Sequence, residues 1–340
     1  MRLSIPPAME YGSSTMMTSP PVSRRKFIKQ TSSALLASSL LDQPVSSQNT
    51  PDDSPHQMTL DLTPRAIGVN TNQLLSLNAL ATKHGFTSVA PPLGQLAELS
   101  DSQLGELLAQ MKEQGITWGT AGCPVSVLSA PSQYESQLAR LPALARSLAK
   151  AGGTRVNTYI SPSSASMTYM TNFQLWSKRL RQIAAILKDH GQRLGLEYIG
   201  THTLLIRRKY PFIHTMAETK DLIDDTGASN IGFVLDSWHW WQAGDRAEDI
   251  LTLKGEEIIA VDLNDAPRDK PKREQLDNQR ELPMATGVID TRSFLSAINQ
   301  TGFDGPVRAE PFNAPLNRMD DEAACAMTSA ALKKAFALLG

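Results

Sequence analysis

Short apolar segments alternate with amphipathic segments along most of this chain, and this alternation constrains its fold more than any other feature. The apolar segments are four to seven residues long and are bounded by turn-forming residues, which is typical of β-strands. The predicted strands are Ala66–Asn70, Thr87–Ala90, Thr117–Gly122, Arg155–Ile160, Leu194–Gly200, Ile231–Asp236, Ile258–Asn264 and Val307–Phe312. Eight buried strands in one chain of this length predict a single large sheet or barrel.

Most of these strands are separated by segments whose apolar residues recur every three or four positions, as in amphipathic helices. The predicted helices are Leu104–Gln114, Gln137–Lys150, Leu175–His190, Met216–Thr226, Thr291–Thr301 and Ala323–Leu339. Glycines follow the ends of predicted helices, where a left-handed cap favours this residue. They are Gly85, Gly115, Gly152, Gly191 and Gly302.

Eight strand–helix alternations over about 275 residues fit a single-domain α/β fold, the (β/α)8 TIM barrel, which typically needs about 250 residues. A doubly wound open sheet is the alternative, and it usually has a glycine-rich turn after its first strand. Here that turn reads Gly68-Val-Asn-Thr-Asn72, so the barrel is favoured. Residues 266–288 form the longest segment without periodicity and are predicted to be a lid or substrate loop at the catalytic mouth.

Four carboxylates follow apolar strand segments, at the end of the barrel where active sites lie. They are Glu197, Asp236, Asp262 and Glu310. Converging buried carboxylates repel one another unless a cation compensates them. The pattern therefore predicts one divalent metal, and oxygen-only ligation favours Mn²⁺ or Mg²⁺ while leaving Co²⁺ and Zn²⁺ open.

Several of these residues have simpler interpretations. Asp236 could cap the helix that follows it, whereas Glu is a poorer cap. His239 shares the Asp236 segment and is predicted to bind substrate. Trp238 lies between them, either as a wall that stacks on a sugar or as plain core packing.

The end of the seventh predicted strand and the segment after it supply three further candidates for substrate binding. Asn264 ends the strand, and Arg268 and Arg280 follow it. An arginine there could hold a hydroxyl, carboxylate or phosphate group.

Composition excludes several classes of protein. The chain has 340 residues, a formal net charge of −1 and 41% hydrophobic residues, as expected for a globular protein. No basic excess is present to neutralise phosphates, which argues against nucleic-acid binding. Two cysteines, Cys123 and Cys325, are too few for a disulfide framework or a thiolate zinc cluster, although one bridge between them stays open.

The N-terminal region differs from the rest of the chain. Ser23-Arg-Arg-Lys-Phe-Ile-Lys29 precedes an apolar run at residues 34–41 and resembles a twin-arginine export signal. The run is much shorter than the roughly 20 residues that span a bilayer, so no transmembrane helix is expected in the mature chain. We predict a disordered signal region at 1–47, a linker at 48–64 and a periplasmic or other extracytoplasmic location, with an uncleaved anchor left open.

Several segments of residues 65–340 together resemble the xylose isomerase-like barrel family of sugar phosphate isomerases and epimerases. They are Gly195–Gly200, Leu235–Trp240, Asp262–Pro267, Arg280–Pro283, Gly287–Asp290 and Asp304–Phe312. The resemblance implies that the family's Glu, Asp, His and Glu metal ligands correspond to Glu197, Asp236, Asp262 and Glu310, so Asp262 departs from the usual histidine. It also implies substrate contacts for His239 and for Arg268.

The resemblance implies a metal-dependent isomerase or epimerase that acts on a small sugar or sugar derivative. The reaction would pass through an enediolate, with Glu197 and Glu310 as the catalytic pair. One alternative is an exported metal-dependent lyase or hydrolase that acts on oxidised sugars or glycosides. Another is a non-catalytic sugar-binding protein whose metal site has decayed, which the presence of Asp262 motivates. A homo-oligomer is left open.

Overall fold

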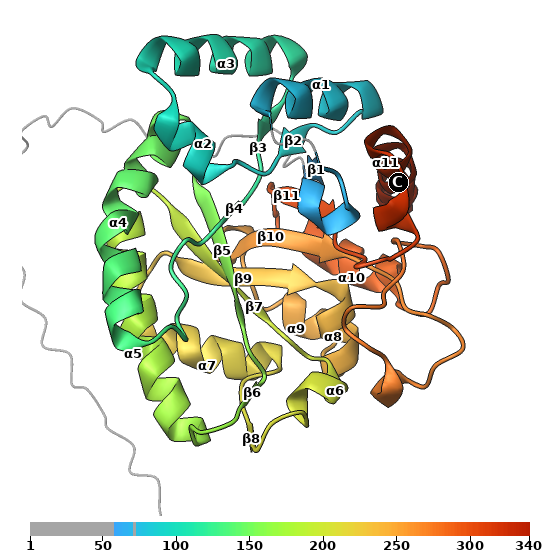
Figure 1. Cartoon of the computed structure of the whole chain (residues 1–340). Coiled ribbons are helices and arrows are strands. Elements are labelled where there is room, and N and C mark those ends of the chain that lie inside the picture. Colours follow the sequence, from blue (N-terminus) through green and yellow to red (C-terminus); the bar gives the residue numbers. More distant parts are fainter. Residues whose placement is uncertain (1–57, 71–72) are drawn as a thin grey trace, which may run out of the picture. The chain divides into compact units, whose positions relative to one another are not determined.

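The computed structural model describes residues 58–70 and 73–340 of the chain (Figure 1). The predicted signal region at 1–47 and most of the predicted linker at 48–64 lie outside the described residues, so export by the twin-arginine route stays a prediction. Within the described ranges, no helix combines the length and apolarity needed to cross a membrane.

The described residues form one parallel sheet that closes into a barrel. The sheet order is β3-β2-β1-β11-β10-β9-β7-β5-β4. Its strands are β1 (Thr59–Leu62), β2 (Ser88–Val89), β3 (Thr117–Trp118), β4 (Ala121–Gly122), β5 (Arg155–Ile160), β7 (Arg193–Tyr198), β9 (Ile231–Asp236), β10 (Ile258–Leu263) and β11 (Pro306–Ala309).

The two edges of this sheet belong to one continuous segment. Only Gly119 and Thr120 separate β3 from β4. Thr117 of β3 pairs with Ser88 of β2, and Ala121 of β4 pairs with Val156 of β5. The segment therefore closes the ring, and with β3 and β4 counted together the described sheet is an eight-stranded (β/α)8 barrel. The predicted fold class is confirmed.

Helices follow the strands and cover the outside of the barrel (Figure 1). They are α1 (Leu74–His84), α2 (Leu93–Glu98), α3 (Asp101–Gln114), α4 (Pro131–Lys150), α5 (Tyr169–Lys188), α6 (His202–Leu205), α7 (Met216–Thr226), α8 (Ser237–Ala243), α9 (Ala247–Ile250), α10 (Thr291–Gln300) and α11 (Asp321–Phe336). All five predicted cap glycines have a positive φ, between 67° and 81°. A short antiparallel pair, β6 (Ser163–Ser164) with β8 (Tyr210–Pro211), lies outside the barrel sheet.

The first predicted strand was wrong. Residues Pro64–Ile67 form a 3₁₀ helix that Gly68 ends with a left-handed cap, and β1 instead lies at Thr59–Leu62, inside the segment predicted to be a linker. Pro64 favours this helix start because its fixed φ suits the first helical position. The true strand is short and contains Asp61, so it lacks the continuous apolar run on which the prediction relied.

The other seven predicted strands are confirmed, and the strands β9 and β5 have the predicted bounds. They were predictable because the strands of a parallel barrel are covered by helices outside and side chains inside, so their sequences are continuously apolar. Both cysteines are free in the structure, so the bridge that the sequence left open is absent from the described residues.

Candidate active site

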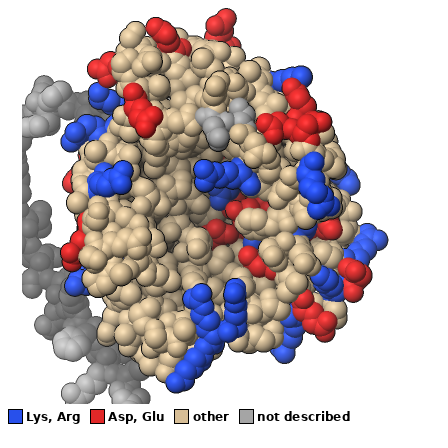
Figure 2. Space-filling model, in the orientation of Figure 1, with Lys and Arg blue, Asp and Glu red and all other residues tan. Residues whose placement is uncertain are grey.

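A cavity of about 370 Å³ lies at the carboxyl ends of the strands. Figure 2 shows a hollow on this face with acidic side chains inside it and basic side chains around its rim. The cavity is lined by Tyr159, Ser161, Pro162, Ser163, Glu197, Ile199, Leu204, Arg207, Arg208, His239, Asp277, Arg280, Glu310 and Phe312. Its volume is near the lower end of the roughly 300–1,000 Å³ found for small-molecule sites, which suits a ligand of modest size.

The structure brings together the four carboxylates that the sequence singled out. Glu197 lies on β7, Asp236 ends β9, Asp262 lies on β10, and Glu310 directly follows β11. One carboxylate oxygen from each lies within 4.8 Å of the others. Alternation along a strand explains this, because Asp262 pairs in register with Asp236 and both side chains then point to the same side of the sheet.

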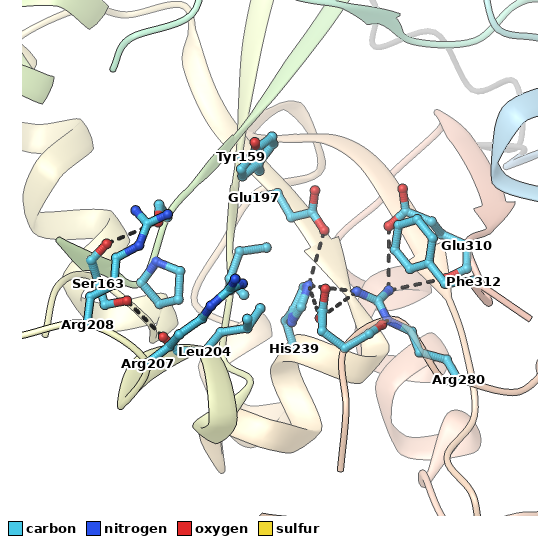
Figure 3. Close-up of a pocket in the computed structure, with 14 residues that line it drawn as sticks. Tyr159, Ser163, Glu197, Leu204, Arg207, Arg208, His239, Arg280, Glu310 and Phe312 are labelled. Atoms are coloured by element: carbon cyan, nitrogen blue, oxygen red, sulfur yellow. Dashed lines mark hydrogen bonds and ion pairs between the residues drawn. The ribbon is translucent and has the colours of Figure 1, made fainter. Parts of the chain in front are cut away.

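Arg280 lies among these acids, and its side chain is only 1% exposed. Its Nη1 donates to Asp236 Oδ2 at 2.8 Å and lies 3.5 Å from Glu310 Oε2. Its Nη2 donates to Asp277 Oδ1 at 2.9 Å. The guanidinium also lies over the Phe312 ring, 4.8 Å from the ring centre. Arg280 is thus a buried counter-ion of the acid cluster as well as part of the cavity wall (Figure 3).

A second buried arginine, Arg308, pairs with Asp262. Its Nε and Nη2 each donate to one of the two Asp262 oxygens, Nη2 at 2.9 Å. The sequence analysis missed Arg308. It lies on β11, two residues before Glu310, so the alternation of side chains along the chain was a signal that it faces the barrel interior.

Asp236 both caps a helix and belongs to the cluster. Its Oδ1 accepts from Trp238 N at 2.7 Å, so it is the N-cap of α8, and also from Asn264 Nδ2 at 3.0 Å. Asn264 Oδ1 in turn accepts from the backbone N–H of Glu310 at 3.0 Å. Asn264 is fully buried and absent from the cavity lining, and it links two of the acids.

His239 reaches the cavity because α8 begins directly at the end of β9. Its Nε2 lies 3.4 Å from Glu197 Oε1 and accepts from Arg280 Nη2 at 3.1 Å. A guanidinium can only donate, so the ring proton is assigned to Nδ1, which faces Thr201 Oγ1 at 3.5 Å. A side chain at Gly200 would collide with the backbone of His239, so this glycine allows the close approach of α8.

Like Asn264, two further predicted substrate-binding residues do not line the cavity. Trp238 is fully buried in the core, and its Nε1 donates to Thr201 Oγ1 at 2.9 Å. Arg268 is exposed, and its Nε donates to the Thr286 carbonyl at 2.8 Å. The aromatic residues that do line the cavity are Tyr159 and Phe312, which the sequence analysis did not select.

Burial and mutual repulsion shift the pKa values of the acidic side chains in the cluster. Burial, with the neighbouring Glu197 and Asp262, raises the pKa of Glu310 well above its ordinary value. Burial also raises the pKa of Asp262 to about 6, although Arg308 opposes the shift. Burial acts in the same direction on Asp277, but Arg280 and His239 outweigh it and hold its pKa below the ordinary value. Burial and mutual repulsion thus raise the pKa values of Glu310 and Asp262 where no cation compensates the cluster.

The donor set fits a divalent cation. The four acids with Asp277 exceed the two arginines in charge, so the cluster retains negative charge that a cation would compensate. Asp262 and one Asp236 oxygen are engaged by arginines. By contrast, no hydrogen bond from the described residues reaches the Glu197 carboxylate, which together with Glu310 remains available to a hard cation.

The sequence model of the xylose isomerase-like TIM barrel family matches residues 79–334. The chain therefore belongs to this family. An inosose isomerase of Bacillus velezensis is 26% identical over 143 residues, which is 42% of this chain and 48% of that relative. The chain thus spans about half the length of this curated relative.

Two solved structures are similar over most of the chain. A xylose isomerase domain protein from Alicyclobacillus acidocaldarius is 29% identical with a TM-score of 0.73, covering 83% of this chain and 99% of that chain. A structure of the IOLI protein with a bound zinc atom has a TM-score of 0.69 at 19% identity, with the same coverage. At this identity, the second similarity concerns the fold alone.

Proposed function

We propose that this protein is a metal-dependent sugar isomerase or epimerase that moves a proton on the carbon next to a carbonyl. The observation that carries the proposal is the placement of Glu197 and Glu310. Both line one cavity, they come from different strands, and they share one acid cluster. The inosose isomerase name of the curated relative supports the same class of reaction.

One divalent cation would be held by Glu197, Asp236, Asp262 and Glu310, with Mn²⁺ or Mg²⁺ favoured by the oxygen donors. When bound, it would supply Lewis-acid polarisation of the substrate carbonyl and hydroxyl oxygens. The zinc atom in the IOLI structure supports a metal in this fold, while the identity of the ion here is part of the proposal.

The chain's own residues divide the proton transfer between them. Glu197 is the base, since its carboxylate accepts no hydrogen bond from the described residues and lines the cavity. Glu310 is the second member of the pair, because it also lines the cavity and comes from a different strand, so it can return the proton from its own side. General acid–base groups of this kind contribute about 10²- to 10⁴-fold to a rate. Arg280 and His239 line the cavity wall beside this pair and limit the space that the substrate can occupy.

Elimination is a second candidate. The glutamate that returns a proton to carbon could equally deliver it to a departing hydroxyl group. The product distinguishes the two reactions, because elimination loses water and leaves an unsaturated product whereas epimerisation conserves the substrate's mass.

The test follows hydrogen exchange with solvent. Ketoses and keto-sugars are incubated in D₂O with the purified protein and Mn²⁺ or Mg²⁺, and NMR and mass spectrometry record deuterium next to the carbonyl and any change of mass. Elemental mass spectrometry records the metal per chain. We expect exchange, and a loss of at least about 10²-fold in Glu197→Gln and Glu310→Gln.

Glu135→Gln is the matched control, because Glu135 is exposed on α4 and absent from the cavity lining. It should exchange at the wild-type rate. Full exchange activity in either cavity variant would overturn the assigned roles. Absence of both exchange and metal uptake in the wild-type protein would overturn the proposed enzyme and favour the sugar-binding alternative.

A further inference from the structure

The cavity has two chemically different sides. On one side lie Glu197, His239, Arg280 and Glu310, which take part in the acid cluster. On the other side lie Arg207 and the adjacent Arg208, from the segment between α6 and β8 (Figure 3). Nothing in the proposed proton transfer uses this second side, so its two positive charges need a separate explanation.

The segment that carries these arginines is held at the cavity mouth. Ser163 of β6 pairs with Pro211 of β8, directly after the arginines. Ser163 Oγ also donates to the Leu204 carbonyl at 2.8 Å, and Thr203 Oγ1 donates to the Gln275 carbonyl at 3.1 Å. The backbone on both sides of Arg207 is thus attached to neighbouring segments, so the arginines are presented to the cavity from an anchored position.

Neither arginine is neutralised within the described part of the chain. No described carboxylate lies within ion-pair distance of Arg207 or Arg208, and the acids of the cluster pair with Arg280 and Arg308 instead. Both arginines are exposed and line the cavity, so each leaves a positive charge there that an anion could pair with. Guanidinium groups suit carboxylate and phosphate oxygens because their paired N–H groups match them.

Other charged and hydroxyl donors of the cavity wall are already engaged, although the exposed Tyr159 hydroxyl is not. Arg280 donates to Asp236, Asp277 and His239. Ser161 Oγ donates to the Ser163 carbonyl. An anionic ligand would also be repelled by the acid cluster, so a negatively charged group in this cavity is favoured only on the side of Arg207.

We infer that the substrate carries an anionic group, a carboxylate or a phosphate, at the end remote from its reacting carbonyl, and that Arg207 and Arg208 bind this group. This inference rests on the proposed function for the orientation of the carbonyl end. The opposite charges of the two sides then orient the ligand, since a reversed ligand would place its anion against Glu197 and Glu310. The substrate class is accordingly a sugar acid or a sugar phosphate.

The test measures binding and turnover separately. Isothermal titration compares three ligands of one carbon skeleton: a neutral ketose, its terminal phosphate ester and the keto-acid with a terminal carboxylate. The proteins are the wild type, Arg207→Gln/Arg208→Gln, and the control Arg140→Gln/Arg146→Gln. Arg140 and Arg146 are exposed on α4 and absent from the cavity lining, so the control removes the same charge elsewhere. Deuterium exchange is recorded on the same samples.

We expect at least one anionic ligand to bind the wild type tenfold or more tightly than the neutral ketose. The cavity double variant should lose that preference, and the control should keep it. The preference should also weaken with rising salt concentration. Tighter binding of the phosphate or of the carboxylate alone identifies which anion the site takes.

Two results would overturn the inference. One is equal binding, or no binding, of the anionic and neutral ligands by the wild type. The other is an anion preference that survives in the cavity double variant as well as in the control. If neutral ketoses exchange deuterium and no anion preference is found, the proposed function stands and the inference about the anionic group is wrong. If an arginine-dependent anion preference is found without exchange, the anion site stands and the proposed reaction is wrong.

Discussion

Two arcs of the barrel, each a set of neighbouring strands, differ in how their buried acidic side chains are paired. In the arc of β7, β9, β10 and β11, the interior carries acids that are paired with Arg280 and Arg308. In the arc of β1 to β4, Asp61 is buried, Thr63 Oγ1 donates to it at 3.0 Å, and its Oδ1 has no hydrogen-bond partner among the described residues. The charge of Arg308 acts on Asp61, but no ion pair joins the two side chains. Strand length follows this division only in part: β7, β9 and β10 have six residues each and β2, β3 and β4 have two, but β11 and β1 have four each. The acids of the first arc are thus bonded to arginines, whereas the second arc holds one acid whose burial raises its pKa.

The largest effect that would test this comparison is expected from Arg280. Replacing it by Met leaves Asp236 and Asp277 buried without their positive partner, which typically costs about 3–5 kcal/mol. Arg268→Met is the matched control, since Arg268 is exposed and bonds only a loop carbonyl among the described residues, and it should cost less than about 1 kcal/mol. Urea unfolding at pH 7 measures both.

Adding a divalent cation gives a second test of the difference between the two arcs. Added Mn²⁺ should stabilise Arg280→Met more than the wild type, because the cation replaces the missing positive charge and binds the folded state. A chelator should reverse the gain. An Arg280→Met protein as stable as the wild type would show that the acids of this arc do not need the arginine.

An intermediate effect is expected from the two buried aspartates. Asp262→Asn leaves Arg308 buried without its partner and should cost about 3 kcal/mol at pH 7. Asp61→Asn should change stability by less than about 1 kcal/mol, since Asp61 has no buried cation bonded to it. Equal costs of the two substitutions would contradict the division between the arcs.

Asp61 also predicts a pH dependence. Burial raises its pKa in the folded state, so the folded protein binds this proton more tightly than the unfolded chain. The contribution of this proton to the free energy of unfolding is complete below the ordinary Asp pKa near 3.9. It is lost as the pH rises through the raised pKa of the folded state. In Asp61→Asn, the unfolding free energy should lack this decline, which denaturant titrations across the acidic range would reveal.

The smallest effect lies outside both arcs, at the half-buried pair of His214 and Glu218. Hydrogen bonding to Glu218 raises the pKa of His214; for Glu218, burial is outweighed by His214, which lowers its pKa. The contribution of His214 to the free energy of unfolding is lost as the pH rises through its raised pKa. The contribution of Glu218 is lost as the pH falls through its lowered pKa. The pair should therefore contribute most between about pH 4.3 and 6.5. His214→Gln should remove no more than about 1 kcal/mol in that window, and an equal loss at pH 9 would contradict this assignment.

Much of the barrel was predictable because its strands are apolar on both faces. Ile231–Asp236 and Arg155–Ile160 were found with their bounds for this reason. Thr59–Leu62 was missed because four residues with one buried acid give too little periodicity. The positions of Trp238 and Arg268 relative to the cavity could not be predicted for a related reason, since a position in a segment after a strand does not specify which way its side chain points.

The order of elements and the convergence of four carboxylates at one end of the barrel follow from local patterns in the chain, because strand periodicity and burial are encoded within a few residues. The partners of those carboxylates do not follow from such patterns. Arg280 reaches Asp236 across 44 positions and Arg308 reaches Asp262 across 46, and Arg207 faces the cavity through contacts of β6 with β8. Contacts between residues so far apart depend on how the strands and loops pack. Only the tertiary structure therefore determines how the charges of the site are paired and which arginines line its mouth.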